Sequence, residues 1–335
     1  MARYEALFDR LGLRDWCDAD STDAPLSMAQ LLAQTKGGEA EAEASGLPFP
    51  SLDTLHEACG RIGQTRDLTE GLENGFLAIR SELKFVLDPI TQPLSWMLDG
   101  TLYVFESAPW WVMMPALLLL TWVVSRSRAV TGFVAFVLLF FAFIDHYEVA
   151  MQTLAIVFVC TGISELLGEP IGIGMSKSDT AQRSIVPILD LLQTLPTFVY
   201  LIPLIFLFSV TESKLYGIAI ILYAIVPVIR LTDLGIRLVD RDVIEAANAF
   251  GLTAWQKLTR VELPLALPNI MAGVNQTIMM SLAMVVIASL VSAPGLGVLV
   301  LRGIRALDLG VGIVAGLGIV LLAALNRVDT RAISK

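Results

Sequence analysis

The sequence predicts an all-α polytopic membrane protein with about seven transmembrane helices and an acidic amino-terminal extension. Of the 335 residues, 55% are hydrophobic and only 16% are charged, whereas a soluble domain carries about 25% charged residues. The charges are also divided unevenly. Residues 1–107 hold 8 Lys and Arg against 18 Asp and Glu, and residues 108–335 hold 15 against 14. Two segments of different composition therefore meet near residue 107.

Seven apolar runs follow residue 107, and most approach the roughly 20 residues that a helix needs to cross a bilayer. They cover residues 109–125, 129–144, 149–168, 185–210, 215–230, 270–293 and 310–326. The fourth run is interrupted by Pro187, Pro196 and Pro203, and such breaks are tolerated where neighbouring helices or water satisfy the backbone. These runs predict a transmembrane domain over residues 108–335.

The distribution of Lys and Arg predicts the orientation of these helices, because cytoplasmic loops are enriched in basic residues. With the amino-terminal tail outside, 12 of the 15 basic residues after position 107 fall on the cytoplasmic side, and only Lys214, Arg302 and Arg305 lie outside. We therefore expect the tail outside and the carboxyl terminus in the cytoplasm. The first residues contain no apolar run typical of a cleavable signal peptide, so a later segment is expected to direct insertion.

The amino-terminal extension divides into two parts. Residues 1–67 form an acidic tail with little apolar periodicity in its middle, which predicts a partly flexible extracytoplasmic segment. Residues 68–107 predict an amphipathic helix at the membrane surface, although packing against the other spans fits the pattern equally well. Its apolar stripe consists of Leu72, Phe76, Ile79, Leu83 and Val86.

Several kinds of site are not expected in this chain. The sequence contains no GxxxxGK[ST] phosphate loop, no HExxH and no GxSxG, so neither ATP binding by that route nor catalytic residues are predicted. Three scattered cysteines do not make a zinc site, so no metal is expected. Nucleic-acid binding requires a basic surface, which a net charge of −9 does not provide.

Ionisable residues inside the predicted spans are few, and Glu165 and Asp190 are the main ones. A carrier coupled to protons or sodium ions would normally need such groups near the middle of the membrane. Both residues are predicted to lie near cytoplasmic helix ends, where water reaches them. A structural role is therefore favoured for both.

The loop between the fifth and sixth spans, residues 240–268, is predicted to be a helical elbow. Asp240 or Asp242 can cap a first helix, and Gly251 is the residue type that favours the left-handed position after a helix end. Thr253 and Gln256 have the spacing of a capping box, which predicts a second short helix. Pro264 and Pro268 then lead into the sixth span.

The elbow also carries a family motif. Glu245-Ala246-Ala247, Gly251 and Leu263-Pro264 match the pattern EAAxxxGxxxxxxxxx[IV]xLP at every fixed position. This segment resembles the EAA loop of ABC importer permeases, which have a MetI-like fold. The resemblance extends over residues 150–328 and is closest to the permeases of glycine betaine/proline betaine importers, with the strongest stretches at residues 189–208, 268–290 and 295–310.

The resemblance implies a transport subunit in a prokaryotic cytoplasmic (inner) membrane, in contact with lipid, rather than an enzyme. In this family a separate ATPase subunit docks on the elbow, a periplasmic substrate-binding protein delivers the solute, and the permease works as a dimer. The chain itself would bind no cofactor, and ATP and Mg would belong to the partner ATPase. The residues implied for ATPase coupling are Glu245, Ala246, Ala247, Gly251, Leu263 and Pro264.

A betaine-like quaternary ammonium solute would be held by aromatic faces and polar groups. Candidate residues lie near the broken fourth span and in the sixth span, although an aromatic residue in a membrane helix is more often a packing residue. They are Gln193, Thr194, Phe198, Tyr200, Asn275, Gln276 and Thr277. Choline, carnitine or trimethylamine N-oxide are alternative solutes for the same machinery. An ATP-independent secondary carrier or channel is an alternative of another class.

Overall fold

The computed structural model of the chain describes residues 11–12 and 65–333, and these contain helices and no strand. The chain divides into two compact units, Met1–Ser81 and Glu82–Lys335. Most of the predicted acidic tail, residues 1–67, lies outside the described residues. The first long helix, α5, covers Thr65–Ser107.

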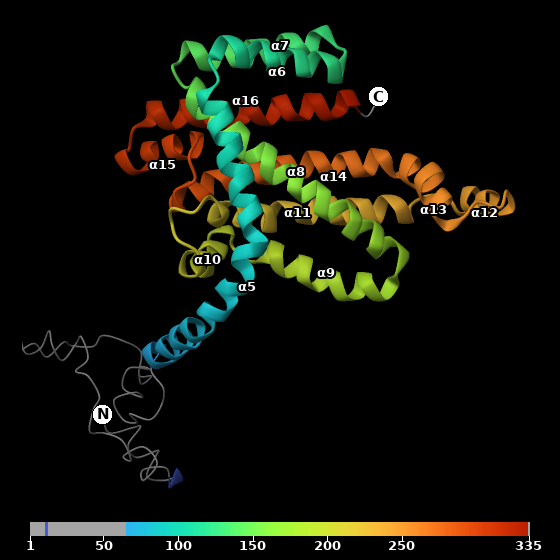
Figure 1. Cartoon of the computed structure of the whole chain (residues 1–335), viewed down its shortest axis with the longest axis horizontal. Helices are drawn as coiled ribbons and strands as arrows, with labels where there is room; N and C mark the ends of the chain where they lie inside the picture. Colours follow the sequence, from blue (N-terminus) through green and yellow to red (C-terminus); the bar gives the residue numbers. More distant parts are fainter. Residues whose placement is uncertain (1–10, 13–64, 334–335) are drawn as a thin grey trace, which may run out of the picture. The chain divides into compact units, whose positions relative to one another are not determined.

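The second unit is built from helices joined by short connections (Figure 1). After α5 the order is α6 Trp110–Ser125, α7 Arg128–Phe143, α8 Tyr147–Lys177, α9 Asp179–Thr194, a 3₁₀ turn Thr197–Tyr200, α10 Leu201–Leu207 and α11 Ser213–Arg237. It continues with α12 Arg241–Ala249, α13 Ala254–Lys257, a π-helical stretch Leu258–Glu262, α14 Leu263–Ala288, a 3₁₀ turn Ser289–Val291, α15 Leu296–Ala306 and α16 Leu309–Ile333.

Each predicted apolar run is helical, but not every run is one straight span. Within residues 65–333, three helices are long and apolar enough to cross a membrane: α8, α11, and Ala254–Val291, which includes α14. Two bent pairs raise this to five: α5 with α6, bent by 115°, and α9 with the segment Thr197–Leu207, bent by 105°. The latter pair is the predicted fourth span, broken at Pro196. Helix α7 and the part of α16 over Leu309–Ala324 are shorter apolar helices.

Helices α8, α11 and α14 pack closely against one another through glycine residues. A Cβ placed on Gly172 of α8 would lie 2.7 Å from the carbonyl oxygen of Ile229 in α11. A Cβ on Gly273 of α14 would lie 3.2 Å from the Cα of Val228. Since these contacts involve backbone atoms, the three helices form the tightly packed centre of the unit.

The second half of α5 packs on the beginning of α11. Leu98 is fully buried, and a Cβ on Gly217 would lie 2.6 Å from its Cδ1 atom. Asp99 accepts a hydrogen bond from Ser213. The packing residues differ from the predicted stripe, in which Leu72, Ile79, Leu83 and Val86 are exposed. A membrane-surface position for residues 68–107 stays a prediction.

Helix α15 is an element that hydropathy did not predict, because Arg302 and Arg305 are exposed on it and lower its mean hydropathy. The helix begins after Gly295, whose φ is +115°. The N–H of Leu296 donates to the hydroxyl of Thr153 in α8 at 2.8 Å. This contact fixes the start of α15 against the central helices.

Candidate functional site

The first helix of the elbow begins where its capping residue predicts. The N–H of Asp242 donates to the carboxylate of Asp240 at 3.0 Å, so Asp240 is the cap of α12. A side-chain acceptor at this position satisfies one of the free N–H groups at a helix start. The predicted choice between the two aspartates is therefore resolved in favour of Asp240.

The same helix ends at Gly251, which has a φ of +75°. The N–H of Leu252 donates to the carbonyl of Ala247 at 3.2 Å, and the N–H of Gly251 donates to that of Asn248 at 2.9 Å. This pair of hydrogen bonds is the Schellman motif, which requires a left-handed residue that is usually glycine. Gly251 is thus needed for its backbone conformation, since a Cβ there would meet no atom within 4 Å.

The second short helix, α13, starts with the predicted capping box. The N–H of Gln256 donates to the hydroxyl of Thr253 at 3.3 Å, and the Gln256 side chain accepts from the N–H of Thr253 at 3.0 Å. The ammonium of Lys257 donates to the side-chain oxygen of Asn248 in α12 at 3.1 Å. The two helices of the elbow are therefore tied to each other by side chains as well as by the turn.

The base of the elbow is joined to three membrane helices. Leu258 is buried in an apolar cluster with Ile236 of α11 and Ile270 of α14. Glu262 is only 3% exposed and is ion-paired with Lys177, the last residue of α8. A displacement of the elbow would therefore be transmitted to α8, α11 and α14 together.

The six predicted coupling residues occupy two different environments. Ala247 is buried and Leu263 packs against the apolar cluster at the base of the elbow. The other four, Glu245, Ala246, Gly251 and Pro264, are exposed. The elbow thus presents part of the motif to solvent and uses the rest for its own packing.

Two aromatic residues of the elbow were not among the predicted residues. Phe250 is 86% exposed and Trp255 is 72% exposed, on either side of the turn at Gly251. Large apolar side chains on a projecting element are typical of a protein interface. Their sequence position could have identified them as exposed contact residues, because both are large apolar residues in a helical segment rich in polar residues.

The predicted solute-path residues of the broken span lie at its bend. Gln193 and Thr194 are the last two residues of α9, and Phe198 lies in the following 3₁₀ turn; all three are exposed. Tyr200 is buried, and its hydroxyl has no hydrogen-bond partner among the described residues. The 3₁₀ turn contacts α14.

The predicted path residues of α14 point in different directions. Thr277 is fully buried, and its hydroxyl has no hydrogen-bond partner in the described part of the chain. The side-chain oxygen of Asn275 is also buried without such a partner, whereas Gln276 is exposed. The structure therefore brings the turn of the broken span to α14 without gathering all seven residues on one surface.

Glu165 lies deeper in its helix than the sequence predicted. The apolar run suggested a helix end near residue 168, but α8 continues through Pro170 to Lys177. Glu165 is consequently twelve residues, or about three turns, from the end of the helix. The predicted position near a cytoplasmic helix end is therefore wrong for Glu165, whereas Asp190 is ion-paired with Arg230 of α11.

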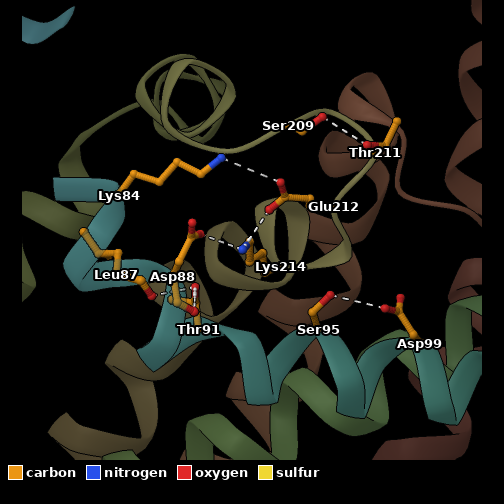
Figure 2. A network of polar contacts seen from close by, with 10 residues as sticks. All are labelled: Lys84, Leu87, Asp88, Thr91, Ser95, Asp99, Ser209, Thr211, Glu212 and Lys214. Carbon is orange, nitrogen blue, oxygen red and sulfur yellow. Dashed lines mark hydrogen bonds and ion pairs between the residues drawn. The ribbon is translucent and has the colours of Figure 1, made fainter. Parts of the chain in front are cut away.

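A polar network at the opposite end of α11 holds α5 in place (Figure 2). Lys214 is 4% exposed, and its ammonium lies 2.7 Å from Asp88 of α5 and 2.8 Å from Glu212. The same ammonium lies 5.2 Å from the centre of the Phe208 ring. Lys84 approaches Glu212 at 3.9 Å. We call Asp88, Glu212 and Lys214 the α5–α11 clamp; these residues line a hollow of about 500 Å³.

Proteins of known function match this chain over most of its length. The family described as "binding-protein-dependent transport system inner membrane component" matches residues 168–328. The glycine betaine/proline betaine transport system permease protein ProW of Escherichia coli (strain K12) is 36% identical, over 94% of this chain and 91% of that protein. The glycine betaine transport system permease protein OpuAB of Bacillus subtilis (strain 168) is 45% identical, over 60% of this chain and 71% of that protein.

A solved structure has the same fold. It is an inward-facing conformation of the MetNI methionine ABC transporter, with a TM-score of 0.50 and 21% identity, over 57% of this chain and 96% of the other. This match confirms the predicted MetI-like fold, and the relatives confirm the predicted family resemblance. The chain is a multi-pass inner-membrane protein that belongs to the family of binding-protein-dependent transport system inner membrane components.

Proposed function

We propose that this chain is the membrane-spanning permease subunit of an ATP-driven importer for a betaine-like quaternary ammonium solute. A periplasmic binding protein delivers the solute, and the permease passes it into the cytoplasm. The elbow is the observation that carries this proposal, because it is a capped, projecting element that is fastened to three membrane helices. The names of the relatives, two of which are glycine betaine permeases, support the class of solute.

The elbow is the docking surface for a separate ATPase subunit. Its exposed residues supply an apolar centre, Phe250 and Trp255, beside the carboxylate of Glu245. Closure of the ATPase moves the elbow, and the pair of Lys177 and Glu262 carries this movement to α8. The equilibria of the two subunits are then coupled in both directions. ATP and Mg bind to the ATPase, and this chain is neither an enzyme nor a cofactor-binding subunit.

The elbow lies on the cytoplasmic side, the amino-terminal tail lies outside, and two copies of the chain form the pore. Cytoplasmic segments are enriched in Lys and Arg, and basic residues gather at the elbow end of the helices. These are Lys177, Arg183, Arg230, Arg237, Arg241, Lys257 and Arg260. Figure 1 shows α16 running toward the same side as the elbow, which supports a carboxyl terminus in the cytoplasm.

The solute path passes the break between α9 and α10 and the adjoining part of α14. The break exposes Phe198 beside Gln193 and Thr194, and an aromatic face attracts a quaternary ammonium group. Tyr200 and Thr277 have buried hydroxyls whose hydrogen-bonding capacity is unused in the described residues. Buried polar groups are normally paired, so these hydroxyls are available to water or solute in another state of the transport cycle. Asn275 and Gln276 complete the set.

The test is uptake of labelled glycine betaine into proteoliposomes that contain this chain, its ATPase and its binding protein. Uptake is expected only when ATP is present on the side of the membrane where the ATPase is bound. Unlabelled choline, carnitine and trimethylamine N-oxide are added as competitors, and the strongest competitor identifies the preferred solute. Uptake that persists without ATP, or without the ATPase, would replace the proposal by an ATP-independent carrier.

A further inference from the structure

We propose that a cavity between α8 and α14 binds the quaternary ammonium group of the transported solute, with Glu165 as its counter-charge. This inference rests on the proposed transport function and specifies where the cationic end of the solute binds. The cavity has a volume of about 180 Å³ and is lined by one face of α8 and by Ile278 of α14. None of the seven predicted path residues lines it.

Glu165 is the unusual member of this cavity. It lies well inside the long apolar helix α8, and among the described residues its carboxylate has no hydrogen-bond or ion-pair partner. Glu169, about one turn further along α8, carries a charge of the same sign. An ionised carboxylate within a membrane segment is costly unless a cation is close to it. A cationic ligand in the cavity would supply the missing charge.

The remaining walls favour a cation that donates no hydrogen bonds. Leu154, Val157 and Ile278 present aliphatic side chains, and Phe158 contributes an aromatic ring that is 67% exposed. A quaternary ammonium group has methyl groups on its surface and carries a diffuse positive charge. Aliphatic walls fit those methyl groups, and the ring face and the carboxylate attract the charge.

Hydrated metal ions and primary amines suit this cavity less well. A metal ion that loses its water needs several oxygen ligands, and a primary ammonium group needs several hydrogen-bond acceptors. Among the described residues of the lining, only Glu165 and Thr161 have oxygen-bearing side chains. The Thr161 hydroxyl already donates to the hydroxyl of Ser281 in α14 at 3.2 Å. The volume is also below the roughly 300 Å³ at which sites for drug-sized ligands begin, so a small head group is the expected ligand.

The cavity recognises one end of the solute only. None of the described residues that line it is basic, so it offers no counter-charge to a carboxylate. A betaine and a simple tetraalkylammonium ion should therefore occupy it in the same way. This expectation separates recognition in the cavity from recognition by the binding protein, which the solute meets first.

The direct test is chemical modification of Glu165 by dicyclohexylcarbodiimide, an apolar reagent for carboxyl groups, followed by mass spectrometry of the intact permease. The protein is held in vesicles of phosphatidylethanolamine and phosphatidylglycerol, whose head groups contain no quaternary ammonium. Tetramethylammonium chloride is expected to slow modification of Glu165 at least about fivefold, whereas sodium chloride at the same concentration has no effect. Glu165→Gln should abolish this modification, and Glu148→Gln, at an exposed position of the same helix, should leave it unchanged.

Three results of this test would overturn the inference. Equal protection by both salts would indicate an effect of ionic strength. The absence of any modification in the ligand-free protein would mean that the carboxylate is closed to small molecules. The cavity would be assigned to a lipid head group if Glu165 were protected in vesicles of phosphatidylcholine and no solute protected it in vesicles without phosphatidylcholine.

Transport provides a second readout that separates this inference from the proposed function. In the complete transporter, Glu165→Gln is expected to lower solute uptake about tenfold, and Phe158→Leu about threefold. Phe143→Leu, at an exposed aromatic position of α7, is the matched control. If the unaltered chain shows no ATP-dependent uptake, the proposed function fails, whatever the labelling shows. If it transports and Glu165→Gln transports equally well, only the cavity assignment fails.

Discussion

Lys177 at the end of α8 and Glu262 at the base of the elbow form an ion pair in which the two side chains are buried to different extents. The Glu262 side chain is 4% exposed, whereas that of Lys177 is 43% exposed. The carboxylate therefore depends on its partner, because water cannot replace the ammonium group. The ammonium group can be hydrated if the carboxylate is removed. This difference gives the two halves of the pair unequal energetic roles.

Replacing Lys177 should consequently cost more stability than replacing Glu262. We expect Lys177→Met to lower the free energy of unfolding by about 3 kcal/mol, because a buried charge is left without a partner. Glu262→Gln should lower it by about 1 kcal/mol, because the remaining Lys177 can be solvated. Thermal unfolding of the purified chain in detergent gives both values. The double variant should be no less stable than Lys177→Met, and equal costs for the single variants would contradict this account.

The turn at Gly251 should control coupling rather than membrane insertion. In Gly251→Val a β-branched residue would have to adopt a φ near the observed +75°, which costs about 1–2 kcal/mol. The Schellman turn should therefore open, and ATP hydrolysis should continue without uptake. Asparagine tolerates the left-handed conformation, so Gly251→Asn is expected to retain most uptake. The measurement is the ratio of solute imported to ATP hydrolysed. Normal coupling in a well-inserted Gly251→Val variant would refute the role given to this turn.

The elbow could be predicted in detail because its signals are local. Asp240 accepts a hydrogen bond from the N–H two residues ahead, and Thr253 and Gln256 bond to each other across three residues. Such contacts depend on spacing along the chain and can be read without knowing the fold. The pairing of Lys177 with Glu262 spans 85 residues. It depends on how α8 and the π-helical stretch before α14 are arranged, and so no local pattern indicated it.

Helix lengths were less predictable, because hydropathy does not detect packing. The apolar run predicted a span that ends near residue 168, yet α8 continues to Lys177. Gly168 and Gly172 explain the continuation, since both pack closely on α11. Tertiary contacts with α11 thus extend the helix beyond the end that hydropathy predicted. As a result, Glu165 lies farther from the helix end than predicted.

The α5–α11 clamp should show strong non-additivity. Lys214 is buried between two acids that are each about one-third exposed, so either acid alone can still neutralise it. We expect Asp88→Asn and Glu212→Gln to cost about 1 kcal/mol each and the double variant to cost about 4 kcal/mol, because only the double variant leaves a buried charge unpaired. Unfolding by heat in detergent measures all three variants.

The control for the clamp is Lys84→Met. Lys84 lies 3.9 Å from Glu212, and both side chains are about one-third exposed, so this variant should change stability by less than about 1 kcal/mol. Strictly additive costs for Asp88 and Glu212 would mean that water reaches Lys214 and that the clamp contributes little to the packing of α5.

The crossing of α8 and α11 provides a matched pair of glycines on one helix. A Cβ on Gly172 would lie 2.7 Å from both the Ile229 carbonyl oxygen and the Cβ of Thr232, whereas a Cβ on Gly174 would meet no atom within 4 Å. Gly172→Ala should therefore force the helices apart and cost about 2 kcal/mol. Gly174→Ala should be neutral or slightly stabilising, because alanine favours a helix by up to about 1 kcal/mol.

The two glycine variants also test whether the α8–α11 contact persists during transport. The same crossing holds Lys177 in position to pair with Glu262, so Gly172→Ala should reduce coupled uptake by more than its loss of folded protein explains. Gly174→Ala should transport normally. If Gly172→Ala is destabilised but couples uptake to ATP hydrolysis as the unaltered chain does, the crossing serves stability alone, and movement of the elbow must reach the pore through α11 and α14.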